Sequence, residues 1–317
     1  MPDVGPRRIP VPGRPAAGAA SPAWRALWRR HEWIRGYTLL LPTFLVMLAL
    51  LGAPLVALVL MSFWTQNDFE LDTSFTIANY AAVLDYQHNP IYLRLLWRSI
   101  VMSGTATVAV ILTAYPMAYF LAFRIRRHKL TWIILITIPF WTSYLLRIFA
   151  WKVILGFNGV INSGLIAAGL IKEPLELLLY NPSAVTITLA HAWAAYAILP
   201  IYVSLEKVDR ALLEAATDLG DSALRRFFRV TLPLSAPGTI AAALLVFIPT
   251  VGDYVTPSLV GGSTGIMIGN IIQTAFGKAN DAPLGSAISI VMMGVVTIVV
   301  CAMLWGTSHR PAMARKA

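Results

Sequence analysis

Two acidic residues one helical turn apart, Glu214 and Asp218, lie in a short polar stretch between two long apolar runs. Two small residues, Ala215 and Ala216, directly follow the first acid, and Gly220 closes the segment. A short helix with small side chains can enter a groove on another protein closely. Its carboxylates can meet cationic groups there, which mainly sets register and specificity. The chemistry expected of this stretch is therefore noncovalent docking.

Catalytic and cofactor-binding patterns are not found elsewhere in the chain. The pair His31-Glu32 lacks a second histidine four residues after the first, and the five histidines are scattered. The glycine-rich run 261–265 is not followed by Lys-Ser or Lys-Thr at P-loop spacing, so it is interpreted as a loop. The lone Cys301 can form neither an intrachain disulfide nor a thiol cluster. We expect no catalytic residue, no metal site and no cofactor on this chain.

The composition indicates a membrane protein. Of 317 residues, 57% are hydrophobic and 13% are charged, whereas about 25% are charged in ordinary soluble domains. Runs of about 18 or more apolar residues are long enough to cross the hydrocarbon core of a bilayer as helices. Six such runs occur, at residues 37–63, 99–123, 130–146 (with room for the helix to continue to 155), 184–205, 237–254 and 284–305. We predict an all-α polytopic membrane protein with six transmembrane helices.

The distribution of basic residues predicts the orientation. If both termini face the cytoplasm, 19 of the 25 lysines and arginines fall in inside segments. The six outside are Arg94, Arg98, Arg147, Lys152, Lys172 and Lys278. The positive-inside rule therefore places both termini in the cytoplasm. The net charge of +10 is then explained by membrane edges that meet anionic lipid, and nucleic-acid binding is not expected.

The remaining segments divide the chain into parts. Residues 1–22 are rich in Pro, Gly, Ala and Arg and are predicted to be a disordered cytoplasmic tail. Residues 23–36 are predicted to form an amphipathic helix in the membrane interface, with a docking surface for a partner subunit as the alternative. The six-helix domain occupies residues 37–306 and contains the cytoplasmic loop 206–236. A cytoplasmic tail, 307–317, closes the chain.

The cytoplasmic loop is predicted to be a helix, a turn and a second helix. Asp209 caps the first helix, and Gly220 ends it with a positive φ. The apolar face of this helix is predicted to consist of Leu212, Leu213, Ala216 and Leu219. Asp221 and Ser222 cap the second helix, which is expected to stop at Pro233. The alternative is an ordinary amphipathic loop helix with solvated acids.

The spacing within this loop resembles that of a known family. Glu214-Ala215-Ala216, three residues, Gly220, nine residues and then Val230-Thr231-Leu232-Pro233 resemble the EAA loop of type I ABC-importer permeases. In that loop Val230 stands where the family usually has isoleucine. The resemblance implies that a partner ATPase is engaged through the following residues: Glu214, Ala215, Ala216, Asp218, Leu219, Gly220, Leu232 and Pro233.

Four other stretches, 139–151, 158–162, 268–272 and 283–287, resemble the spermidine/putrescine permease subfamily. Relatives that move other small organic cations or opine-like solutes share much of this pattern. The resemblance implies a bacterial inner-membrane permease without catalytic activity of its own. It would work with a second permease subunit, a dimer of ATP-binding subunits and an extracytoplasmic solute-binding protein. The alternatives from other classes are a stand-alone secondary transporter or channel and a membrane-embedded enzyme.

A polyamine path would need a carboxylate and aromatic faces, the latter for cation–π contacts. Asp253, near the outer end of the fifth run, is the best acidic candidate, because intramembrane charges usually face a cavity. The aromatic candidates are Tyr254, Trp141, Tyr144, Trp193 and Tyr196. In the alternative interpretation Asp253 pairs with Arg147 as a structural bridge, and the aromatic residues form an interface belt.

Overall fold

The computed structural model describes residues 32–67, 70–125, 127–175, 178 and 180–308. The chain divides into two compact units, Met1–Ala57 and Leu58–Ala317. The predicted tail 1–22, most of the predicted interfacial helix 23–36 and most of the tail 307–317 lie outside the described residues. Helix α2, Glu32–Met61, contains Pro42 and Pro54 and supplies the first apolar span.

A small β-hairpin follows α2 and was not predicted. Its strands, β1 (Thr65–Asn67) and β2 (Glu70–Asp72), are antiparallel, with Thr65 opposite Asp72. The short helix α3, Ala78–Leu84, comes next. The side-chain amide of Asn79 donates to the carbonyl oxygens of Ser62 and Trp64 at 3.2 and 2.8 Å. These bonds tie α3 to the residues just before the hairpin.

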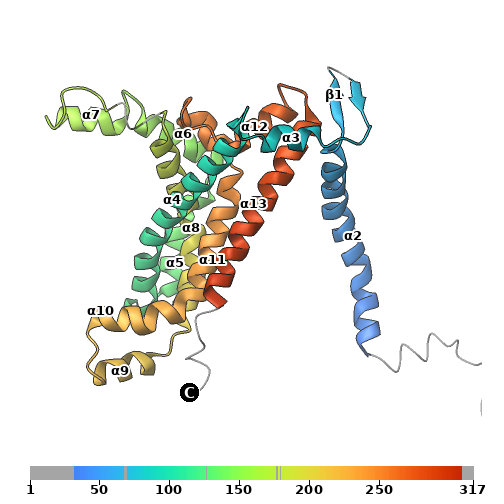
Figure 1. Ribbon diagram of the computed structural model, residues 1–317. Helices are drawn as coiled ribbons and strands as arrows, with labels where there is room; N and C mark the ends of the chain where they lie inside the picture. The colour runs from blue at the N-terminus through green and yellow to red at the C-terminus, as the bar shows by residue number, and fades with distance from the viewer. Residues whose placement is uncertain (1–31, 68–69, 126, 176–177, 179, 309–317) are drawn as a thin grey trace, which may run out of the picture. The chain divides into compact units, whose positions relative to one another are not determined.

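Three long helices form the centre of the second unit: α4 (Ile91–Tyr119), α8 (Pro182–Glu206) and α11 (Leu232–Val251). They pack against one another (Figure 1). Small residues allow this close approach: a Cβ added to Gly238 on α11 would lie only 2.3 Å from Cβ of Ser204 on α8. The hydroxyls of Tyr115 and Ser235 also meet at 2.7 Å and join α4 to α11. Four further elements contact the three helices: the turn η1 (Phe120–Arg124), the turn η5 (Pro257–Gly261), α12 (Ile268–Phe276) and α13 (Ala282–Ser308).

The third predicted span, 130–146, is wrong as a single helix. The structure has α5 (Lys129–Thr137), a 3₁₀ turn η2 (Ile138–Trp141), then a break, α6 (Tyr144–Leu155) and α7 (Val160–Ala167). Pro139 has no N–H to continue an α-helix, and Thr142 has extended backbone with ψ of 154°. The third stretch long and apolar enough to span is Tyr144–Ala167, whereas Lys129–Trp141 is a shorter apolar helix.

Six spans are nevertheless found within the described residues, as predicted. They are Leu39–Met61, Ile91–Arg124, Tyr144–Ala167, Pro182–Glu206, Ala223–Val251 and Ala282–Trp305. The second begins eight residues earlier than predicted. The fifth begins 14 residues earlier than residue 237, because helical structure continues out of the cytoplasmic loop.

Candidate functional site

The helix that carries the two acids, α9, extends from Arg210 to Asp218. At its start the carboxylate of Asp209 accepts a hydrogen bond from the backbone N–H of Ala211 at 2.9 Å. At its end Gly220 has φ of +87°, in the left-handed region that glycine adopts at little cost. The predicted cap, helix and glycine turn are therefore all confirmed.

The second helix begins as predicted but does not end as predicted. Ser222 accepts a hydrogen bond from the backbone N–H of Arg225 at 3.4 Å and caps α10, Ala223–Arg226. A π-helical turn, η4 (Phe227–Thr231), then leads directly into α11. Pro233 does not stop the helix, because it lies in the first turn of α11, where a missing N–H is tolerated.

We call residues Asp209–Thr231 the coupling hairpin, after the role that the resemblance of its sequence implies, and its two arms are bound to each other. Asp221 accepts from Arg229 at 3.3 Å, and the guanidinium of Arg226 donates to the hydroxyl of Thr217. The ring of Phe227 packs against Tyr115 of α4, with 5.6 Å between ring centroids. The hairpin is thus braced internally and attached to the central helices.

The face that the coupling hairpin exposes differs from the predicted face. Ala216 is turned inward with 8% of its surface exposed, whereas Leu219 is 88% exposed. The expectation that both belong to one apolar face is therefore wrong, because Leu219 lies beyond the last helical residue, in the turn. Glu214 and Asp218 are exposed as well, and among the described residues neither forms an ion pair.

Further apolar side chains complete this exposed face. Leu224 and Phe228, from α10 and η4, are exposed beside charged Arg225 and Arg229. The hairpin therefore presents acids, arginines and unburied apolar side chains together. Such a mixed surface is typical of a protein–protein contact.

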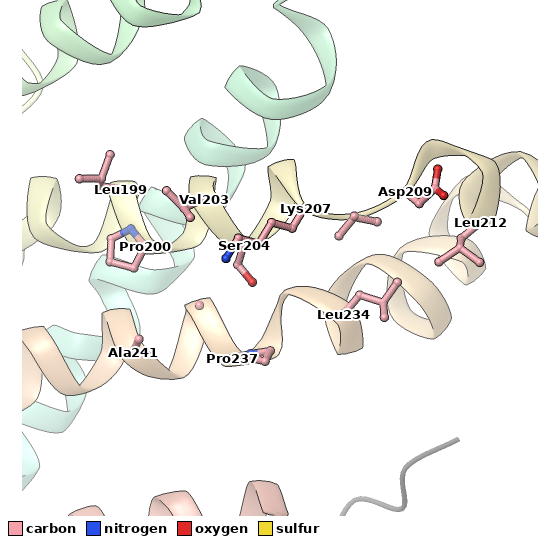
Figure 2. Close-up of a pocket in the computed structure, with 12 residues that line it drawn as sticks. Leu199, Pro200, Val203, Ser204, Lys207, Asp209, Leu212, Leu234, Pro237 and Ala241 are labelled. Atoms are coloured by element: carbon pink, nitrogen blue, oxygen red, sulfur yellow. The ribbon is translucent and has the colours of Figure 1, made fainter. Parts of the chain in front are cut away.

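A groove of about 650 Å³ lies where α8, the start of α9 and α11 meet. Its walls are mainly apolar, from Leu199, Val203, Leu212, Leu234 and Pro237, and Lys207 and Asp209 lie along the connection between α8 and α9 (Figure 2). Leu212 is the residue of α9 that lines the groove, and the remaining walls come from α8, the connection after it and α11. The hairpin is joined to the bundle by the chain around Val208, by α11, and by the packing of Phe227 against Tyr115.

Asp253, the acidic candidate for the solute path, is 9% exposed and its carboxylate is fully hydrogen-bonded. It accepts from the hydroxyl of Tyr144 at 2.6 Å and from the hydroxyl of Thr256. It also accepts from the backbone N–H groups of Val255 and Thr256, at 2.9 and 3.4 Å. This carboxylate caps the helical turns that end in η5, and it ties them to the first residue of α6.

Arg147 uses its guanidinium on backbone carbonyls. It donates to the carbonyl oxygens of Ala192 at 2.9 Å, Phe140 at 2.8 Å and Thr142 at 3.1 Å. Its charge also lies 5.0 Å from the centroid of the Phe140 ring. Among the described residues Arg147 forms no ion pair, so the bridge to Asp253 considered above is not formed. The carbonyls of Phe140 and Thr142, beside the break after η2, and that of Ala192 in α8 are the competing partners.

Three of the five aromatic candidates come together beside Asp253. The rings of Tyr144 and Trp193 lie 6.2 Å apart between centroids, and those of Trp193 and Tyr196 lie 5.1 Å apart. We call these three residues the aromatic cluster. Tyr254 is about half exposed and Trp141 is 81% exposed, and neither makes a ring contact with the cluster within the described part of the chain.

Sequence reasoning missed two participants in this region. Thr256 shares the carboxylate of Asp253 with Tyr144. His191 lies against the rings of Phe140 and Trp151, at centroid distances of 5.7 and 5.2 Å. A lone histidine or threonine inside an apolar run has no second residue at a sequence spacing that would indicate a shared site. No signal in the sequence could therefore have identified either residue.

The structure also bears on the chemistry that the sequence excluded. Within the described residues, no three His, Cys, Asp or Glu side chains gather as a metal site would require. The prediction that the sequence contains no catalytic pattern is wrong as to spacing, because the run 261–265 fits the Gly-x-Ser-x-Gly spacing of a hydrolase nucleophile turn. That turn follows a strand, whereas Gly261 ends the helical turn η5, and Gly262, with φ of +59°, packs against Tyr180. The run is a loop.

Comparisons with known proteins agree with this architecture. Residues 30–313 match the family described as "Binding-protein-dependent transport system inner membrane component". The chain is 40% identical over 215 residues (68% of this chain, 73% of the relative) to the spermidine/putrescine transport system permease protein PotB of Haemophilus influenzae (strain ATCC 51907 / DSM 11121 / KW20 / Rd). It is 38% identical over 242 residues (75% and 86%) to the protein of the same name from Escherichia coli (strain K12).

A solved structure shows the same fold. It is a bacterial alginate ABC transporter in complex with an alginate pentasaccharide-bound periplasmic protein, matched with a TM-score of 0.66 and 16% identity. The match covers 93% of this chain and 98% of the matched chain. Six apolar spans, the coupling hairpin at its expected place and these matches lead to one conclusion: the chain belongs to the family of binding-protein-dependent transport system inner membrane components and has the fold of an ABC-importer permease.

Proposed function

We propose that this chain is one of two permease subunits of an ATP-driven polyamine importer, and that the coupling hairpin docks on the ATPase. The observation that carries the docking role is the exposed face of the hairpin. Glu214, Asp218 and Leu219 are left unpaired or unburied on a hairpin that is otherwise fully capped and braced. A structural loop helix would have turned its apolar side chains inward.

The partner surface follows from this face. Leu219, Leu224 and Phe228 call for an apolar groove on the ATPase subunit, and Glu214 and Asp218 call for cationic side chains near its rim. Arg225 and Arg229 call for acids on the other side of the groove. When ATP closes the ATPase dimer, a groove of this kind would pull the hairpin as one body, because its arms are bound to each other.

The proposed orientation places both termini and the coupling hairpin in the cytoplasm. The support is the excess of lysine and arginine on that side. The change in the third span does not alter the argument, because a single crossing within residues 129–167 leaves the later segments on the same sides. The opposite end, with the β-hairpin and α12, would then face the extracytoplasmic solute-binding protein.

The proposed solute is a polyamine, spermidine or putrescine. The support is that two relatives, aligned with more than two thirds of this chain, are spermidine/putrescine transport system permease proteins. In the path we assign the cation to the aromatic cluster rather than to the carboxylate of Asp253. That carboxylate already accepts four hydrogen bonds, whereas Tyr196 is exposed and offers a ring face.

The test is ATPase activity of the complete assembly in lipid vesicles. Two permease subunits, the ATPase dimer and the binding protein are combined, and the binding protein is added empty or loaded with spermidine or putrescine. We expect the loaded form to stimulate hydrolysis and uptake together. If the complex assembles and polyamines do nothing, the solute is another organic cation or an opine-like compound. Uptake without ATP would instead indicate a stand-alone secondary transporter.

A further inference from the structure

The segment Lys129–Trp141, formed by α5 and η2, is bound only loosely along its length. None of its residues, all of which the structure describes, is buried. Ile133 and Ile136 are its side chains that pack against the apolar cluster of the central helices. By contrast, α4, α8 and α11 each bury several side chains in the same region. The position of α5 and η2 therefore depends on how their two ends are held.

The inner end is held by an ion pair. The ammonium nitrogen of Lys129 lies 2.6 Å from a carboxylate oxygen of Glu206, and 3.5 Å from the carbonyl oxygen of Ala122. Glu206 is the last residue of α8 and stands three residues before Asp209, the cap of α9. The joint that carries the coupling hairpin is thus also the joint that holds the beginning of α5.

The outer end is held by Arg147. Its guanidinium binds the carbonyls of Phe140 and Thr142, where η2 ends, and the carbonyl of Ala192 on α8. Tyr144 lies one helical turn before Arg147. It belongs to the aromatic cluster, and its hydroxyl donates a hydrogen bond to Asp253. The far end of the segment is therefore clamped directly beside the proposed solute path.

We propose that α5 and η2 form a strut between the coupling hairpin and the aromatic cluster, with Lys129, Glu206 and Arg147 as its positioning residues. The inference rests on the proposed docking role of the hairpin. A displacement of the joint at Glu206 moves Lys129, the strut moves along its length, and the clamp at Arg147 passes the motion to Tyr144. A loosely packed helix with polar ties at both ends suits this role, because only the partly buried Ile133 and Ile136 pack against the apolar cluster and oppose its sliding.

The ion pair matters for coupling rather than for folding. Both side chains are partly exposed, and ion pairs of this kind contribute little to stability. They do fix which groups stay together when elements move. The readout is therefore the number of ATP molecules hydrolysed per spermidine taken up by the complete assembly in vesicles, measured beside the melting temperature of the complex.

The experiment is a charge-reversal cycle with Lys129→Glu, Glu206→Lys and the double variant. We expect each single reversal to raise the ratio of ATP to spermidine roughly fivefold, the lower end of typical coupling between sites. The double variant, which restores the pair in reverse, should return the ratio close to wild type. Arg127→Glu is the matched control: Arg127 lies two residues earlier, is exposed, and should leave the ratio unchanged.

Two results would overturn the strut. Single reversals that lower the melting temperature or assembly while the ratio stays normal would make the pair merely structural. Single reversals without any effect would remove the pair from the mechanism. If the reversed variants do not assemble, Lys129→Met and Glu206→Gln remove the charges without creating repulsion. Each of these variants should also raise the ratio of ATP to spermidine. Glu214→Ala in the same assay separates the two proposals, because a normal ratio there would overturn the docking role instead.

Discussion

The coupling hairpin and the Asp253 region both contain carboxylates, but the molecule uses them in opposite ways. Glu214 and Asp218 are exposed and have no ion-pair partner among the described residues. Asp253 is buried and accepts four hydrogen bonds from its own chain. An acid left free on a rigid surface is available to another protein. An acid whose acceptor sites are occupied holds its own backbone, even when it lies beside a proposed path.

The two regions also differ in the sequence distance that their contacts bridge. The bonds that shape the hairpin join residues two to nine positions apart, such as Asp209 with Ala211 and Thr217 with Arg226. Asp253 and Arg147 also form local bonds, but in addition each is bonded to a distant residue, 109 and 45 positions away. The hairpin can therefore keep its shape when the spans move, whereas the outer region changes whenever one helix moves relative to another.

The largest effect is expected for Gly220→Pro, which tests the rigidity of the hairpin. Proline is locked near φ of −65°, and Gly220 has φ of +87°, so the turn cannot form. Because an incompatible proline costs ~3 kcal/mol or more, uptake should fall by roughly tenfold or more while the chain still inserts. Gly220→Asn is the control, since asparagine tolerates the left-handed region. Equal loss in both variants would show that the turn geometry is not the cause.

The next effect is expected for Glu214→Ala, which tests whether the free acid faces a partner. Removal of a central charged contact at an interface typically costs ~1–2 kcal/mol, so the affinity of the permease pair for the ATPase dimer should fall by roughly tenfold. The measurement is ATPase binding to the permease in detergent or lipid. Glu214→Gln keeps the shape of the side chain without its charge, so its affinity for the ATPase dimer should lie between those of the wild type and Glu214→Ala. Wild-type affinity in both variants would make Glu214 a solvated residue of an ordinary loop helix.

The sequence predicts the hairpin better than the Asp253 region, because the contacts of the hairpin join residues that are close in sequence. Asp209, Gly220 and Ser222 act on neighbours within one turn, so caps and the turn were predicted correctly. The inward turn of Ala216 and the exposure of Leu219 depend on what packs beneath the hairpin, and there the prediction was wrong. The break at Thr142 was missed, because a proline inside an apolar run predicts a kink as readily as a break. The distant partners of Arg147 and Asp253, which are Ala192 and Tyr144, lie on other helices, and one sequence carries no signal that pairs them.

A moderate effect is expected for Asp253→Asn, which tests whether the buried acid is structural. The asparagine side chain has one acceptor oxygen in place of two, so a donor from Tyr144 or Thr256 loses its partner. An unsatisfied buried donor costs ~1–3 kcal/mol, which should lower the melting temperature of the permease. The concentration of polyamine for half-maximal uptake should stay near wild type. A large rise in that concentration at unchanged stability would instead assign Asp253 to the solute.

The smallest effect is expected for Tyr196→Leu, which tests whether the aromatic cluster binds the cationic solute. Tyr196 is about half exposed and packs against Trp193 at 5.1 Å, so leucine keeps apolar bulk but removes the ring face. A cation–π contact at such a site is worth ~0.5–1 kcal/mol, so half-maximal uptake should require roughly two- to fivefold more polyamine, with the melting temperature unchanged. Tyr196→Phe keeps the ring and should restore the wild-type value.

The Tyr196 and Asp253 variants are opposite in design: the Tyr196 variant should change solute affinity without changing stability, and the Asp253 variant should change stability without changing solute affinity. If both change the same quantity, the aromatic cluster and the carboxylate act as one unit, and the separation of path from scaffold fails.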